Sequence, residues 1–168
     1  MSLSMHQASA PVFIQGLNSL VVVLDKGAAH IEAKSLDHAA LLQARLFPDM
    51  FPFIRQVQIA TDFAKGGMAR LAGVEVPAWE DTDASFADLK ARVERTIAYV
   101  GEFTAAQVDG SEARDITLVR RGETSHVAGQ AYLLQQVLPN FYFHRTTAYA
   151  ILRHNGVELG KRDFIAAV

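Results

Sequence analysis

Two polar residues stand one helical turn apart in the segment PNFYFHRTTAYAILRHNG at 139–156, namely Asn140 and His144. Residues four positions apart share one face of a helix, so an amide and an imidazole at this spacing can grip one ion or hydrogen-bond one ligand. The chain has six histidines and no cysteine, which excludes thiolate nucleophiles, disulfides and cysteine-ligated zinc. His144 is therefore the first residue to consider for chemistry.

Helices must position these side chains, and apolar residues recur at three- and four-residue steps in four long segments. The predicted helices cover residues 11–31, 49–71, 85–103 and 139–156, with Ser85 as the N-cap of the third. A short helix is expected over 35–45 with Ser35 as its N-cap, and Gly122 between two β-prone runs predicts a hairpin near residues 115–127. The pattern indicates an all-α four-helix bundle with a small β-hairpin.

Composition fits a single helical-bundle domain over residues 1–168, with residues 1–8 as a loose N-terminus. The net charge of −2 gives no electrostatic case for nucleic acid as a partner. No apolar run reaches the roughly 18–20 residues of a membrane span, and no secretory signal pattern is present. We therefore expect a cytoplasmic protein that binds neither nucleic acid nor membrane.

Four polar side chains point toward the interior of the predicted bundle. Asn140 and His144 share the inward face of the last helix, and Asp49 and Gln56 share the apolar stripe of the second. Because bundle cores hold sites built from facing helices, these residues form a candidate pocket with Trp79 at its rim. The alternative is structural, since a buried imidazole and amide can satisfy each other and nearby carbonyl groups.

A divalent metal at this cluster would have few good ligands. Of the four residues, only His144 and Asp49 are good metal ligands, because the amides of Asn140 and Gln56 are neutral. Arg45 stands four residues before Asp49 in RLFPDMFPF and can pair with it across the break between two helices. That pairing would make the segment a structural connection between the two helices. It would also leave Asp49 less available to orient the imidazole of His144. No residue is assigned a catalytic role.

The segment HRTTAYAILRHNG resembles the last helix of the DinB/YfiT-like superfamily of four-helix bundles, in which it reads H-x-x-x-H with LR and Gly further on. His144, Leu152, Arg153 and Gly156 match, whereas Asn140 stands where the first histidine is expected. No histidine occurs between residues 39 and 125, so the superfamily's ligand on the second helix is missing too. The resemblance carries over only His144 as a metal-ligand position.

A closer resemblance is to a branch of that superfamily described only as a domain of unknown function. It rests on RLFPDMFPFIRQV, ARLAG and LPNFYFHRTTAYAILRHNGVELGKRDF, and it covers about residues 12–165. The leading hypothesis is a small-molecule-binding protein or degenerate enzyme with a pocket around His144. The alternatives are a divalent-metal-dependent thiol transferase and a non-enzymatic, dimeric interaction module. We expect a homodimer, through outward-facing Tyr142, Tyr149 and Val21–Val23.

Overall fold

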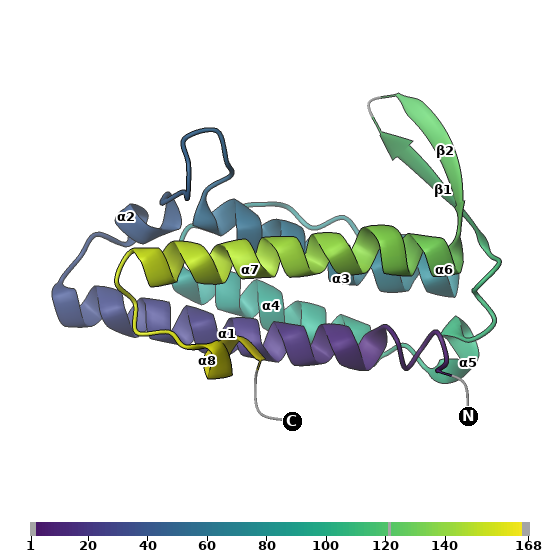
Figure 1. Cartoon of the computed structure of the whole chain (residues 1–168), viewed down its shortest axis with the longest axis horizontal. Coiled ribbons are helices and arrows are strands. Elements are labelled where there is room, and N and C mark those ends of the chain that lie inside the picture. Colours follow the sequence, from purple (N-terminus) through teal and green to yellow (C-terminus); the bar gives the residue numbers. More distant parts are fainter. Residues whose placement is uncertain (1–2, 121, 166–168) are drawn as a thin grey trace.

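Four long helices form the body of the molecule, and the β-hairpin projects from one end (Figure 1). They are α1 (Ala10–Lys34), α3 (Phe53–Ala72), α4 (Phe86–Gly101) and α7 (Leu138–His154). α1 lies against α4, and α3 lies against both α4 and α7, so the four helices enclose one core. The computed structural model describes residues 3–120 and 122–165. The predicted all-α four-helix bundle is confirmed.

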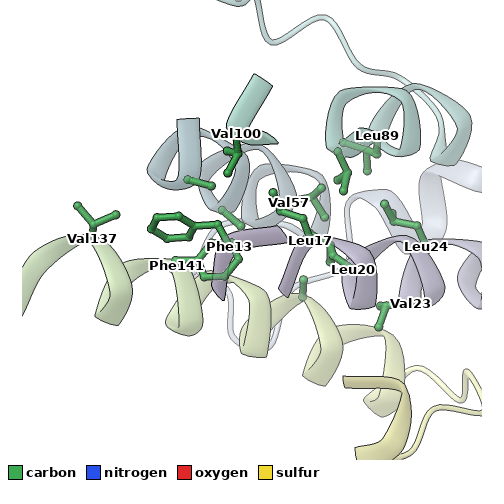
Figure 2. Close-up of a cluster of buried hydrophobic side chains, with 14 of the residues drawn as sticks. Phe13, Leu17, Leu20, Val23, Leu24, Val57, Leu89, Val100, Val137 and Phe141 are labelled. Atoms are coloured by element: carbon green, nitrogen blue, oxygen red, sulfur yellow. The ribbon is translucent and has the colours of Figure 1, made fainter. Parts of the chain in front are cut away.

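Aliphatic and aromatic side chains from all four helices fill the core (Figure 2). Phe13 and Phe141 meet edge to face with ring centroids 5.2 Å apart, and Phe53 stacks on Phe86 at 5.4 Å. Burying a side chain of this size contributes about 1.5–3 kcal/mol. By length and composition α1 could cross a membrane. Its apolar face instead packs into this core, as expected of the central helix of a bundle.

Short polar residues set the helix ends. The Ser85 hydroxyl accepts the N–H of Asp88 at 3.1 Å, so this residue is the predicted N-cap of α4. Ser35 differs from the prediction, because it ends α1 in a left-handed conformation with φ of 50°. The short helix α2 (His38–Leu42) begins later, where the Asp37 carboxylate accepts the N–H of Ala39 at 2.9 Å.

The second long helix begins at Phe53, four residues later than predicted. Pro52 is its N-cap with an extended ψ of 165°, and a proline has no N–H to donate. Residues 43–52 form a loop in which Arg45 donates to the Met50 carbonyl oxygen at 2.5 Å. Asp49 therefore lies in an exposed loop and not on the inner stripe of a helix.

The predicted hairpin is confirmed and follows the short helix α5 (Ala105–Val108). Strands β1 (Asp115–Arg120) and β2 (Glu123–Ala128) pair antiparallel, with Asp115 opposite Ala128. Helix α6 (Gly129–Ala131) and the π-helical turn η1 (Tyr132–Val137) then run directly into α7. Pro139 therefore lies inside a continuous helical segment, and the wider π turn before it accommodates its missing N–H.

Part of the segment 1–8, which is predicted to be loose, contacts the bundle through Met5 and His6, whereas Leu3 is exposed. The Met5 side chain is buried, and Ser9 is fully buried. The His6 N–H donates to the Asp109 carboxylate at 2.8 Å, and its imidazole Nε2 lies 3.0 Å from the Phe103 carbonyl oxygen. Residues 1 and 2 lie outside the described residues.

The last described helix is α8 (Lys161–Ile165), which lies against α1 (Figure 1). Lys26 of α1 pairs with Asp163 at 2.8 Å. The Phe164 ring covers the guanidinium of buried Arg145 at 4.0 Å, and that guanidinium donates to the Phe164 carbonyl oxygen at 2.9 Å. The last described helix therefore closes the outer side of α1 and α7.

Candidate functional site

Helices α7 and α3 bring His144 against Gln56. The Gln56 side-chain N–H donates to the Phe51 carbonyl oxygen at 3.0 Å, which turns its Oε1 toward the imidazole. His144 Nδ1 lies 2.7 Å from that oxygen. An amide oxygen only accepts, so Nδ1 carries the proton and Nε2 of the neutral ring bears the lone pair. Nε2 has no hydrogen-bond partner among the described residues.

The surroundings of His144 keep its imidazole neutral at pH 7. Burial lowers the pKa of His144, and the positive charge of Arg55 lowers it further. The ring stacks on Phe63 with centroids 5.9 Å apart and meets the edge of Phe143 at 5.2 Å. A neutral imidazole with an unpartnered Nε2 can accept a hydrogen bond or a proton from a ligand.

The other predicted members of the inner cluster do not join this pair. Asn140 donates to the Gln136 carbonyl oxygen at 2.7 Å, within its own helical segment. Asp49 is exposed in the loop before α3, and the predicted pairing of Arg45 with Asp49 is absent from the ion pairs of the described residues. The predicted cluster is therefore reduced to His144 and Gln56.

The residues around His144 do not fit a divalent metal. Zinc and similar ions take three or four imidazole, thiolate or carboxylate ligands, whereas this site offers one imidazole and the neutral amides of Gln56 and Asn140. Both amides already donate to backbone carbonyl oxygens. Across residues 3–120 and 122–165, no three His, Asp or Glu side chains gather in a group able to hold a metal ion.

Trp79 lines a different hollow, which we call the Trp79 cavity. It has a volume of about 440 Å³ and lies between α3, the loop that follows α3, and the hairpin. Phe63, Trp79 and Tyr132 supply aromatic rings, and Lys65 and Arg70 supply positive charge. Phe63 connects the two places, because it lines this cavity and also stacks on His144.

An ion-pair network fixes the loop that carries Trp79. The buried Arg92 of α4 binds Asp83 at 2.8 Å and Asp81 at 2.9 Å, and Arg55 of α3 also pairs with Asp81. Charge-assisted bonds to a buried guanidinium are strong and directional. The loop is thereby attached to two helices, which makes this wall of the cavity rigid.

Two cations flank the indole ring of Trp79. Lys65 Nζ lies 4.6 Å from the ring centroid, and the Arg95 guanidinium lies 4.1 Å from it. Such contacts contribute about 0.5–2 kcal/mol each and fix the orientation of the ring. The face of the cavity that Trp79 forms is therefore pre-organised.

Sequence reasoning placed Trp79 at a pocket rim but missed Phe63, Lys65, Arg70 and Tyr132. A usable signal existed on α3, where Phe63, Gly66 and Arg70 recur at three- and four-residue steps and mark one face. No comparable signal identified Tyr132, because residues 130–138 gave no clear periodicity. Its place follows from the π-helical turn that the structure shows.

Comparison with known proteins settles the family. A family model described as Domain of unknown function (DUF1993) matches residues 5–165. The chain belongs to the DUF1993 family. A crystal structure of a DinB family member protein from Shewanella denitrificans is 38% identical and has a TM-score of 0.88, covering 97% of this chain and 92% of that one. The DinB-like fold is thus confirmed for this DUF1993 chain.

A search of curated proteins finds no match to the chain. The family assignment therefore supports the fold of the DUF1993 chain and indicates no particular activity.

Proposed function

We propose that this DUF1993 chain binds a small organic molecule in the Trp79 cavity, as a binding protein or a degenerate enzyme. The observation that carries the proposal is a hollow of about 440 Å³ in which aromatic rings and two cations converge. Small-molecule sites have volumes of roughly 300–1,000 Å³ and combine apolar walls with a few placed polar groups. The proposed site therefore differs from the predicted pocket around His144. Phe63 lines the proposed site and stacks on His144.

A divalent-metal-dependent thiol transferase is the weaker alternative. It would need metal ligands at His144, and the neutral amides of Gln56 and Asn140 do not supply them. The proposed function therefore contains no metal-dependent step.

The sole tryptophan of the chain makes the proposal directly testable. Because Trp79 lines the cavity, its fluorescence reports on whatever enters. A library of small aromatic and aliphatic compounds is titrated into the protein, and emission and thermal stability are recorded. We expect some compounds to change Trp79 emission with Kd values at or below about 1 mM and to raise the Tm.

A matched pair of variants locates the binding. Ala78 is exposed and lines the cavity, so Ala78→Phe fills the space without disturbing the core. Ala87 is equally exposed on α4 and lies outside the cavity lining, so Ala87→Phe is the control. The proposal predicts that Ala78→Phe abolishes binding and Ala87→Phe leaves it unchanged. Equal binding by both variants, or no binding compound at all, would overturn it.

The cytoplasm is the proposed location. Support comes from α1, the one membrane-span candidate among the described residues, whose apolar face packs into the bundle core. Fractionation of cells that express the chain tests this, and recovery with the membranes would contradict it.

A second candidate function is assembly with another copy of the chain. An apolar hollow of about 340 Å³ between α7 and the loop after α2 has no charged residue in its lining. Leu46, Tyr142 and Phe143 line it and are 40%, 40% and 55% exposed. These residues replace part of the predicted surface, because Val23 is buried and Tyr149 packs against Phe164. A second copy presenting the same apolar face is the occupant we propose.

A further inference from the structure

We infer that the ligand of the Trp79 cavity is a monocarboxylic acid with an apolar body, whose carboxylate is bound by Arg70. The inference rests on the proposed function and goes further, because it names the chemical class of the ligand and the residue that selects it. Three observations carry it: the charge balance of the cavity, the hydrogen bonds of Arg70, and the apolar residues in the cavity lining.

Among the described residues, the charged side chains that line the cavity leave one positive charge uncompensated. They are Asp62, Lys65 and Arg70. Asp62 and Lys65 pair with each other at 3.0 Å. Among the described residues, no Asp or Glu oxygen lies within 4.0 Å of the Arg70 guanidinium. A ligand with a single negative charge would therefore balance the cavity.

Two hydrogen bonds hold the guanidinium of Arg70 in place, and both come from the same nitrogen atom. Its Nη1 donates to the Gly66 carbonyl oxygen at 3.3 Å and to the Tyr132 hydroxyl oxygen at 3.1 Å. A guanidinium carries five N–H donors, and no described residue accepts from its Nε or Nη2. The buried polar atoms without a partner are Arg92 Nη1, Ser111 Oγ and Arg145 Nε, so the Arg70 Nε and Nη2 atoms do not belong to that group. The remaining donors are available to a carboxylate, whose two oxygens match this planar fork.

Tyr132 is a positioning residue for Arg70. The π-helical turn Tyr132–Val137 places its ring in the cavity wall and its hydroxyl beside the guanidinium. Single π turns within α-helices occur often at functional sites, because they redirect one side chain. Here the redirected side chain orients Arg70, the one described cation of the cavity lining that has no acidic partner.

The apolar part of the cavity lining suits an apolar body. Phe63 and Trp79 contribute aromatic rings to the lining, and Leu118 and Val119 of the hairpin contribute aliphatic side chains. The Val119 side chain is 69% exposed, so it gains a partner when a ligand enters. An aromatic or aliphatic acid fits this combination better than a small inorganic anion, which would leave these walls uncovered.

Matched pairs of an acid and its amide test the inference. Phenylacetate against phenylacetamide, and hexanoate against hexanamide, are titrated into the protein while Trp79 fluorescence and heat are measured. We expect each acid to bind at least about tenfold more tightly than its amide, as a charge-assisted bidentate contact should give. Phenylphosphonate is included, and tighter binding of this dianion than of phenylacetate would overturn the assignment to monocarboxylates.

Variants assign the preference to Arg70. Arg70→Met keeps the length of the side chain and should remove the acid–amide difference, whereas Arg70→Lys should keep part of it. Tyr132→Phe removes only the orienting hydroxyl and should weaken acid binding about threefold without changing amide binding. Arg153→Met is the control, because Arg153 is exposed on α7 outside the cavity lining.

The outcomes separate the inference from the proposed function. If acids and amides bind equally, or if the acid preference persists in folded Arg70→Met and Tyr132→Phe, the carboxylate assignment fails while the cavity remains a binding site. If neither member of any pair changes Trp79 emission or releases heat, the proposed function fails with it. Loss of the preference in Arg70→Met but not in Arg153→Met supports the inference.

Discussion

His144 and Arg70 differ in the surroundings of their side chains. His144 is half-buried beside Gln56 and two aromatic rings, which favours its neutral form. Arg70 instead supplies N–H donors, two of its hydrogen bonds being to the Gly66 carbonyl oxygen and the Tyr132 hydroxyl. At the residue scale, His144 therefore offers a hydrogen-bond acceptor and Arg70 offers donors. Only Arg70 lines the cavity of the proposed function.

The depressed pKa of His144 predicts that acid destabilises the fold through this residue. As pH falls, the unfolded chain takes up the proton at the ordinary pKa of 6.5, before the folded chain does. The stability contributed by the neutral imidazole is therefore present above about pH 6.5 and lost between that value and the lower folded pKa. We expect the urea midpoint to fall less between about pH 7.5 and about pH 5 in His144→Gln than in the unchanged chain.

His154→Gln is the control for this measurement, because its side chain is exposed at the end of α7. Its urea midpoint at about pH 7.5 should be close to that of the unchanged chain, which would show that replacing a histidine on α7 does not by itself alter stability. An identical pH dependence in His144→Gln and the unchanged chain would show that burial does not disfavour the charged form of His144.

The ligand chemistry around His144 predicts that two substitutions create a metal site. Gln56 contacts the imidazole at 2.7 Å, and Asn140 lies one turn before it on the same helix. Gln56→His with Asn140→His would place three imidazoles together, which is a ligand set that zinc accepts. Elemental analysis after purification without a histidine tag should find about one zinc per chain in the double variant.

The unchanged chain and each single variant serve as controls and should retain far less zinc. A double variant that folds and retains no more zinc than the unchanged chain would mean that these three positions do not converge on one ion.

At the element scale, the junction between the hairpin and the last helical segment depends on Gly129. A Cβ atom at this position would overlap the backbone carbonyl oxygen of Ser111, which cannot move aside as a side chain could. We expect Gly129→Ala to reduce the free energy of unfolding by about 2–3 kcal/mol, measured in urea. Gly101→Ala is the matched control, because a Cβ there meets nothing within 4 Å.

Gly101→Ala should leave stability unchanged or raise it by up to about 1 kcal/mol, since alanine favours a helix over glycine. Equal effects of the two substitutions would indicate that the close approach of Gly129 to Ser111 does not determine how the π-helical turn is placed.

The elements that the sequence predicted well are those set by local signals. Ser85 caps α4 as expected, and the hairpin around Gly122 forms. Pro52 was placed inside a helix, although two prolines within five residues favour a loop, and Asp49 was misplaced for that reason. The continuous helix through Pro139 could not be predicted, because a π turn has no sequence period of its own.

The candidate site was harder to predict than the fold for a physical reason. The contact between His144 and Gln56 follows from two helix faces that periodicity identifies. The Trp79 cavity instead combines α3 with a loop and a hairpin that are distant in sequence. The distance between such elements is set by packing of the whole molecule, which no local pattern encodes.

At the scale of the whole molecule, the exposed apolar hollow beside Tyr142 and Phe143 predicts a homodimer. Such a surface is stabilised when a second copy covers it. Sedimentation equilibrium at several concentrations should give twice the chain mass, and Phe143→Glu should shift the species to the monomer. His154→Glu, on the exposed end of α7, is the control and should leave the dimer intact. A monomer at high concentration would contradict the prediction.

A crystal soaked with 4-bromophenylacetate shows whether the Trp79 cavity is a binding site. Anomalous scattering from the bromine locates the ligand without interpretation of weak density. We expect a peak between Trp79 and the hairpin, with the carboxylate at Arg70, and no peak in Ala78→Phe crystals. A peak only at another surface, such as the hollow beside Phe143, or no peak in crystals whose cavity is open to solvent, would contradict it.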